Sequence, residues 1–164
     1  MHVLLPLSPG LSMRSGVNTV RNVLEAYAER GIFSGFNEAR SGHFRFVWVL
    51  RQPMELNVDT AKQALNFRQL LPGIVMGSAL YDDVKAFLEQ RHDAALPAHR
   101  RVDPKRAALS CTNRKGRVSI SLQVKNNQYA YGTNRIVNVV HELFQHLRDA
   151  YPDYLAENFG VPQE

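Results

Sequence analysis

The string HELFQH, residues 141–146, holds the residue types of a zinc site and is where catalytic chemistry would first be sought. Zinc metalloproteases carry two histidines four residues apart, which stack on one face of a helix, with a glutamate between them as general base. Here the histidines, His141 and His146, are five residues apart, so on a helix they point roughly 140° apart. We therefore expect them not to share one metal ion, and we expect Glu142 to point away from the apolar side of its helix.

The remaining reactive residue types show no catalytic spacing either. Asp82 and Asp83 are adjacent, and adjacent residues on a helix diverge by about 100°. Cys111, the single cysteine, falls in a predicted strand, where a small buried side chain is expected. Ser119 and Ser121 lie on the solvent side of a predicted strand with no nearby base in the sequence. We predict no catalytic, cofactor-binding or metal-ligating residue and no cofactor, and keep an enzyme with dispersed active-site residues as an alternative.

Positive charge is concentrated between residues 91 and 117. This basic segment has eight Lys or Arg and two Asp, a net charge of +6, whereas the rest of the chain has 12 basic and 13 acidic residues, a net charge of −1. Such a segment can attract phosphates or an acidic protein, or can be a solvated loop and hairpin tip. It contains no Phe, Tyr or Trp for stacking on bases. Nucleic-acid binding through residues 91–117 is therefore an alternative to protein binding.

The length and composition indicate one globular domain over residues 1–164. The chain is 45% hydrophobic, which is ordinary for a folded domain, and its one cysteine allows no intrachain disulfide. No apolar run approaches the roughly 18 residues that suggest a membrane span, and the N-terminal run, broken by Pro6 and Pro9, does not resemble a signal peptide. We expect a cytoplasmic protein without a membrane partner.

Helical periodicity predicts four helices, each bounded by capping residues. Residues 1–14 are expected to be an irregular lead-in, and residues 152–164 a short helix followed by a tail. Ser15 and Thr133 are expected to cap the two longest helices. Each predicted helix shows a helical spacing of apolar residues or a terminal proline and glycine. The predicted helices cover residues 15–30, 78–91, 133–150 and 153–158.

Alternating apolar and polar residues predict five strands. Residues 63–68 also fit the continuation of a helix, and we favour the strand. Residues 31–42, with glycines at both ends, are expected to form a loop. The predicted strands cover residues 43–50, 54–59, 63–68, 107–112 and 117–124.

These elements predict an α+β fold in the order α-βββ-α-ββ-α, with a largely antiparallel, twisted sheet and helices packed on one face. The order, from the helix at residue 15 to the end of the helix at residue 150, resembles that of the class I chaperones of type III secretion. The resemblance lies in the three strands, the helix 78–91, the hairpin 107–124 and the helix 133–150, and no sequence motif accompanies it. It implies a small dimeric chaperone that binds a protein partner.

We therefore expect a non-catalytic protein-binding or chaperone-like module with an unidentified protein partner, and consider a homodimer. The strand 43–50 is apolar on one face and partly apolar on the other. It is either an edge or a face offered to a partner, or a central strand buried on both sides. In the core, we expect the apolar side of the helix 133–150 to pack against the apolar side of the strand 117–124.

Overall fold

A computed structural model describes residues 9–162 of the chain. The helices are α1 (Pro9–Glu29), α2 (Ala79–Gln90), α3 (Tyr129–Ala150) and α4 (Pro152–Phe159), with a short 3₁₀ turn, η1 (Val49–Arg51). The strands are β1 (Ser34–Arg40), β2 (His43–Val47), β3 (Pro53–Asp59), β4 (Ala64–Leu71), β5 (Ala107–Arg114) and β6 (Arg117–Val124).

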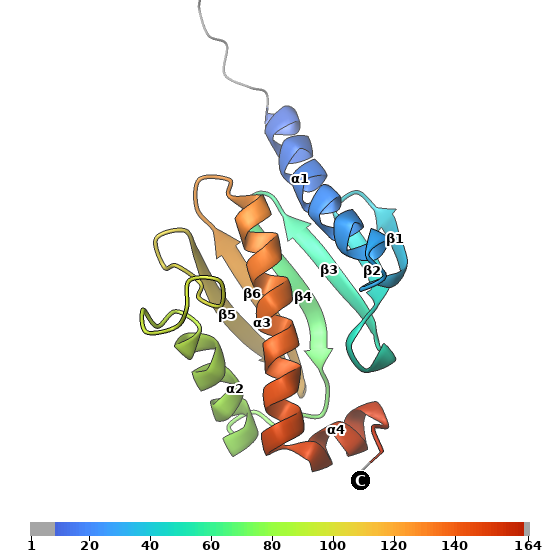
Figure 1. Ribbon diagram of the computed structural model, residues 1–164, viewed down its shortest axis with the longest axis vertical. Coiled ribbons are helices and arrows are strands. Elements are labelled where there is room, and N and C mark those ends of the chain that lie inside the picture. The colour runs from blue at the N-terminus through green and yellow to red at the C-terminus, as the bar shows by residue number, and fades with distance from the viewer. Residues whose placement is uncertain (1–8, 163–164) are drawn as a thin grey trace, which may run out of the picture.

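The six strands form one antiparallel sheet in the order β1-β2-β3-β4-β6-β5. Helices α1, α2 and α3 lie on one face of this sheet, with α3 along its middle and α4 at the lower end (Figure 1). The strands β1 and β5 are the two edges. The predicted α+β class and the order α-βββ-α-ββ-α are confirmed, with one additional strand, β1, ahead of the predicted three.

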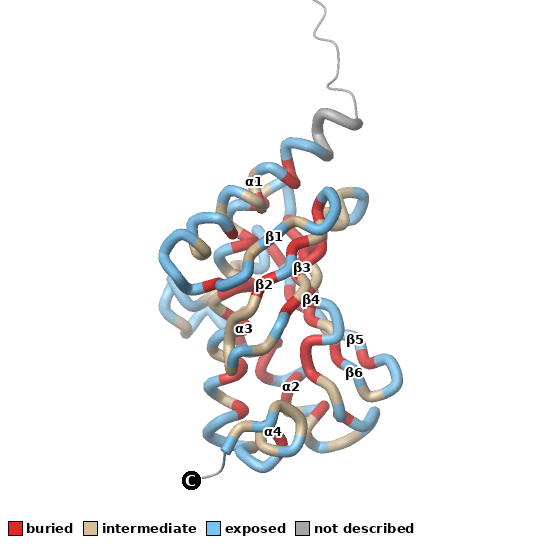
Figure 2. The backbone as a smooth tube through the Cα atoms, turned by 90° about the vertical axis from the view of Figure 1, so that its right-hand side faces the viewer, coloured by how far each residue is buried: buried red, intermediate tan, exposed pale blue. Residues whose placement is uncertain are grey.

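The core lies between α3 and the strands beneath it. Apolar residues of β6, at every second position from Val118 to Val124, are buried together with the side of α3 that carries Ile136, Val140 and Leu143, as predicted. Buried positions alternate with more exposed ones along the strands (Figure 2). At Gly132 the two elements are so close that an added Cβ would collide with Val124, so the glycine permits the close approach.

The predicted loop 31–42 is wrong, because residues 34–40 form the edge strand β1. Its Ser, Gly, Asn and Glu residues give little local strand preference. The strand forms because Phe36 stacks on Phe44 and Phe46 of β2, with ring centroids 5.9 Å and 6.3 Å apart. Tertiary packing thus outweighs local propensity here.

The predicted strand 43–50 is too long, because β2 ends at Val47. The chain then turns through η1, where Leu50 has a φ of 56°, a left-handed conformation that is uncommon for leucine. The chain reverses over residues 48–52, and a hydrogen bond from the Trp48 N–H to the Gln52 carbonyl closes the turn. Because β1 pairs with β2 on its other side, β2 is internal and offers no free edge.

The segment 63–68, which was predicted as a strand with a helix as the alternative, is a strand. It forms most of β4, which pairs with β3 on one side and with β6 on the other. In the turn before it, the Asp59 carboxylate accepts a hydrogen bond from the Lys62 N–H at 3.2 Å. Gln69, with a φ of 49°, interrupts the regular pairing with β6 before Leu71.

Two predicted helix starts are wrong. Helix α1 begins at Pro9, inside the predicted irregular lead-in 1–14, and residues 1–8 lie outside the described part of the chain. Proline suits a first helical turn, so Pro9 begins the helix that Ser15 was expected to cap. Helix α3 begins at Tyr129, and Thr133 is fully buried inside it, donating its hydroxyl to the Tyr129 carbonyl at 2.7 Å.

The other boundaries agree with prediction within a few residues. Ser78 caps α2 by accepting a hydrogen bond from the Tyr81 N–H at 3.2 Å. The hairpin 107–124 is formed by β5 and β6, and Gly160, in a left-handed conformation, ends the C-terminal helix α4. None of the described helices has the length and apolar content needed to cross a lipid bilayer.

Candidate functional site

The histidines of HELFQH lie in α3 and contact different parts of the fold. His141 stacks on Trp48, with ring centroids 6.4 Å apart, whereas His146 contacts Asp83 of α2 through Nε2 and Oδ2 at 2.9 Å and stacks on Phe87. The two side chains therefore diverge and contact different elements, as their spacing predicts. Within residues 9–162 no group of three His, Cys, Asp or Glu is placed to hold a metal ion.

Glu142, the residue that a zinc protease would use as its base, joins the basic segment to α3. It accepts hydrogen bonds from Arg91 Nη1 at 2.5 Å and from Arg100 Nε at 3.0 Å. The side chains of Arg91 and Glu142 are only 9% and 17% exposed. The Arg91 guanidinium also lies over the Phe87 ring, 4.2 Å from its centroid. The glutamate therefore neutralises a nearly buried cation.

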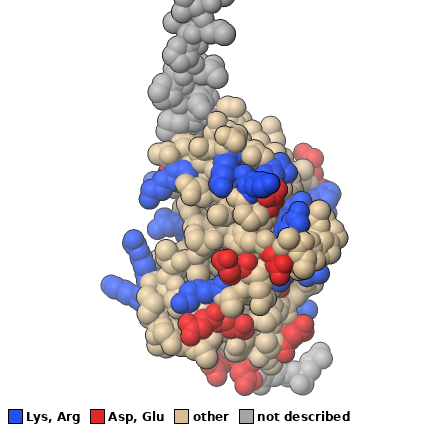
Figure 3. All heavy atoms as spheres, turned by 90° about the vertical axis from the view of Figure 1, so that its left-hand side faces the viewer, with Lys and Arg blue, Asp and Glu red and all other residues tan. Residues whose placement is uncertain are grey.

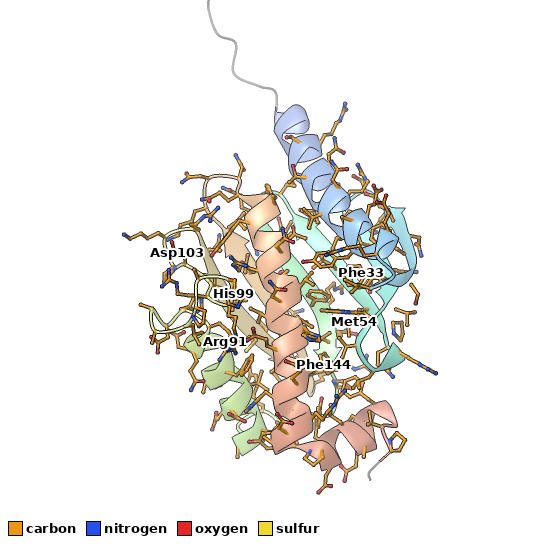
Figure 4. All side chains as sticks on the ribbon, viewed as in Figure 1. Phe33, Met54, Arg91, His99, Asp103 and Phe144 are labelled. Carbon is orange, nitrogen blue, oxygen red and sulfur yellow. The ribbon has the colours of Figure 1, made fainter. Side chains whose placement is uncertain are left out.

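Other residues of the basic segment between 91 and 106 are also held against α3 (Figure 4). Arg106 lies over the Tyr131 ring at 3.7 Å, and the Tyr131 hydroxyl accepts a hydrogen bond from the Asp103 N–H at 2.9 Å. Arg135 of α3 donates to the carbonyl of His99 at 3.0 Å. On this side of the molecule the Lys and Arg side chains are separated by other surface and interrupted by acidic groups (Figure 3). The segment 91–117 therefore does not form one continuous basic surface.

Cys111 is half-buried in β5, facing the helices. Burial raises the pKa of its thiol, and a hydrogen bond with Tyr81 and the charge of Lys85 only partly oppose this. A thiol with a raised pKa is a weak nucleophile at neutral pH. Ser119 and Ser121 lie on the other face of the sheet, as predicted, where their hydroxyls contact Gln69 and Asn66.

The face of the sheet opposite the helices, which we call the open face, carries the most developed site. It holds a broad depression of about 710 Å³ lined almost entirely by polar residues from β2 to β6. The open face has three notable features: a row of polar side chains across five strands, three arginines, and one buried amide oxygen without a hydrogen-bond partner in the described structure.

The polar row consists of side chains that are direct neighbours across the strands. Its members, each paired with the next in the sheet register, are His43, Asn57, Asn66, Ser121 and Ser110. The Ser121 hydroxyl donates to Asn66 Oδ1 at 2.6 Å. Asn57 is only 8% exposed, and its Oδ1 has no hydrogen-bond partner within the described structure. A buried polar atom without a partner is costly, and such atoms are uncommon in folded proteins.

The arginine trio comprises Arg68 of β4, Arg114 of β5 and Arg117 of β6, which line the same depression. Arg114 and Arg117 are direct partners in the hairpin register, and like charges facing each other across two strands are destabilising. Arg117 donates to Gln69 Oε1 at 3.1 Å. Neither Arg68 nor Arg114 has a side-chain partner among residues 9–162.

No motif and no run of charge along the chain indicates this site. The signal that could have indicated it is the alternation within each strand. In β3, β4, β5 and β6, the polar residues that alternate with the buried apolar ones all point to the same face of the sheet. Only the strand order places Asn57, Arg68 and Arg114 on a common surface.

Comparisons with known proteins add no further assignment to this geometry. No protein-family model, no curated protein and no solved structure matches the chain.

Proposed function

We propose that the chain is a non-catalytic protein-binding module, chaperone-like in its element order, and that it binds its partner on the open face of the sheet. The observation that supports this proposal is the shape and chemistry of the depression. It is wide and open to solvent and is lined by hydrogen-bonding side chains and arginines from five strands. Pockets for small molecules enclose most of the ligand and are mainly apolar, whereas arginine is enriched where proteins meet.

The alternatives from the sequence differ in what they predict for this face. For nucleic-acid binding, the open face provides three arginines but no Phe, Tyr or Trp among its lining residues on which a base could stack. An enzyme would need converging groups in a site that excludes water, and the depression is open. Protein binding therefore accounts best for the face, and a cytoplasmic location and kinship with the type III secretion chaperones are part of the same proposal.

The proposal is tested by crosslinking in the native cell. A photoreactive amino acid replaces Thr112, an exposed residue lining the depression, or Asp149, an exposed residue of α3 on the helical side. We expect illumination to give an adduct of discrete mass with the probe at position 112 and none at position 149. The absence of a discrete adduct from position 112, or the same adducts from both positions, would refute protein binding through the open face.

A homodimer is a separate proposal, and the strand β5 supports it. This edge strand pairs with β6 without interruption over eight residues and carries no charge before Arg114, so its edge has few of the features that prevent strand association. The Leu109 N–H is already bonded to His92 Nε2 at 3.0 Å, which leaves the C-terminal half for pairing. Size-exclusion chromatography with light scattering tests the dimer, and a monomer mass at every concentration would remove it.

A further inference from the structure

The open face has an excess of positive charge that the described structure does not neutralise. Among the residues lining the depression are the arginine trio and Lys62, against a single acid, Asp59. Asp59 already accepts a hydrogen bond from the Lys62 N–H and lies in the same cross-strand row as Ala64 and Gln123, at the opposite end of β6 from Arg117. The facing pair Arg114 and Arg117 therefore lacks a counter-charge, and a bound anion would remove its repulsion.

The buried amide of Asn57 indicates what kind of anion fits. Its Oδ1 needs a hydrogen-bond donor, which a phosphodiester backbone does not have. A peptide group presents a donor and an acceptor side by side and so matches an asparagine amide. Asn66 lies directly opposite Asn57 in the register, so two amides stand next to each other on this face. An extended polypeptide satisfies both amides, while its acidic side chains satisfy the arginines.

We propose that the open face binds an extended, acidic segment of a partner protein. The main chain of the segment bonds to Asn57 and Asn66, and its carboxylates pair with Arg68, Arg114 and Arg117. From β3 to β5 the face spans three strand spacings, about 14 Å, which about five residues of extended chain can cross. This inference rests on the proposed protein-binding function and specifies the chemistry of the partner.

A direct binding measurement tests the inference with defined probes. A fluorescein-labelled ten-residue peptide of alternating Glu and Ser is titrated with the full chain and followed by fluorescence anisotropy. Matched probes are a Lys-Ser peptide of the same length and a ten-nucleotide single-stranded DNA. We expect the acidic peptide to bind, the basic peptide not to bind, and the affinity to fall as salt is raised from 50 to 300 mM, because the contacts are exposed ion pairs.

Two variants locate the binding. Replacing two of the exposed arginines, R68A with R114A, is expected to weaken acidic-peptide binding about tenfold, the combined effect of two solvent-exposed ion pairs. The matched control, R148A, removes an exposed arginine from α3 and is expected to leave the affinity unchanged. N57A is expected to weaken binding at 50 and at 300 mM salt by the same factor, since it removes a hydrogen bond and not a charge.

Several results would overturn the inference. They are no binding of the acidic peptide, equal binding of the basic peptide, tighter binding of the DNA, or an affinity that R68A with R114A leaves unchanged. The crosslinking result separates this failure from failure of the proposed function. If position 112 gives an adduct but the acidic peptide does not bind, protein binding through the open face stands and only the proposal of an acidic segment is refuted.

Discussion

The contact between Glu142 and Arg91 allows a quantitative prediction about what holds the basic segment in place. The variant E142Q keeps the size of the side chain and one acceptor oxygen but removes the charge. Arg91, whose side chain is 9% exposed, then loses its counter-ion while its Nε already lacks a hydrogen-bond partner within the described structure. Removing one partner of a buried ion pair is strongly destabilising because the other charge remains away from water.

We expect E142Q to lower the free energy of unfolding by about 3 kcal/mol, the lower end of the range for a broken buried pair, because both side chains retain some solvent contact. For a chain of this length that corresponds to a fall in Tm of roughly 6–12 °C. Urea unfolding followed by circular dichroism measures the first quantity, and thermal unfolding measures the second.

The matched control is R100A, which removes the other arginine bound to Glu142. The Arg100 side chain is 45% exposed, so its ion pair is screened by solvent and its loss is expected to leave the urea midpoint close to that of the wild type. The double variant R91M with E142L, which replaces the pair by apolar side chains, is expected to recover part of the lost stability. If E142Q is no more destabilising than R100A, the pair is effectively solvated and the reasoning is wrong.

Three further predictions concern other parts of the fold. The bidentate hydrogen bond from Arg21 lowers the pKa of Glu38 below its ordinary value of 4.5, so its stabilisation is present above pH 4.5 and is lost as the pH falls through the lowered pKa. The difference in unfolding free energy between wild type and E38Q should thus be constant near neutral pH, at up to about 1 kcal/mol, and should vanish in acid; a constant difference down to pH 2 contradicts it. G132A gains about 1 kcal/mol in helix propensity but pushes a methyl group into Val124, at a cost of about 1–3 kcal/mol, so urea unfolding should show a net loss, and a stabilised variant would show that the two elements can separate. Because burial raises the pKa of Cys111, its thiol should react slowly with a disulfide reagent at pH 8 in the folded protein and quickly in urea, and equal rates would refute this protection.

Much of the secondary structure follows from the sequence because the apolar periodicity of each element is local. The strict alternation in residues 117–124 and the 3.6-residue spacing in α3 each define one apolar face, and a helix and a strand that each expose such a face pack together. The spacing of His141 and His146 likewise determined that they diverge, since the helical angle per residue depends on the backbone alone.

What the sequence did not determine depends on contacts between distant segments. Strand β1 exists because Phe36 meets the rings of β2, and Thr133 lies inside α3 because residues 129–132 pack against the sheet. The sequence also did not determine which charged side chains are paired. Arg91 is neutralised by a glutamate 51 residues away, whereas Arg114 faces Arg117 with no acid beside it.

The open face is the clearest case of this division. The sequence determined that Asn57, Asn66 and Ser121 would lie on the polar side of their own strands, because successive side chains of a strand point to opposite faces. The pairing of β4 with β6, across the 45 residues between them, decided that these side chains form one row. A candidate binding surface assembled in this way has no motif, since its members are neighbours only after the chain has folded.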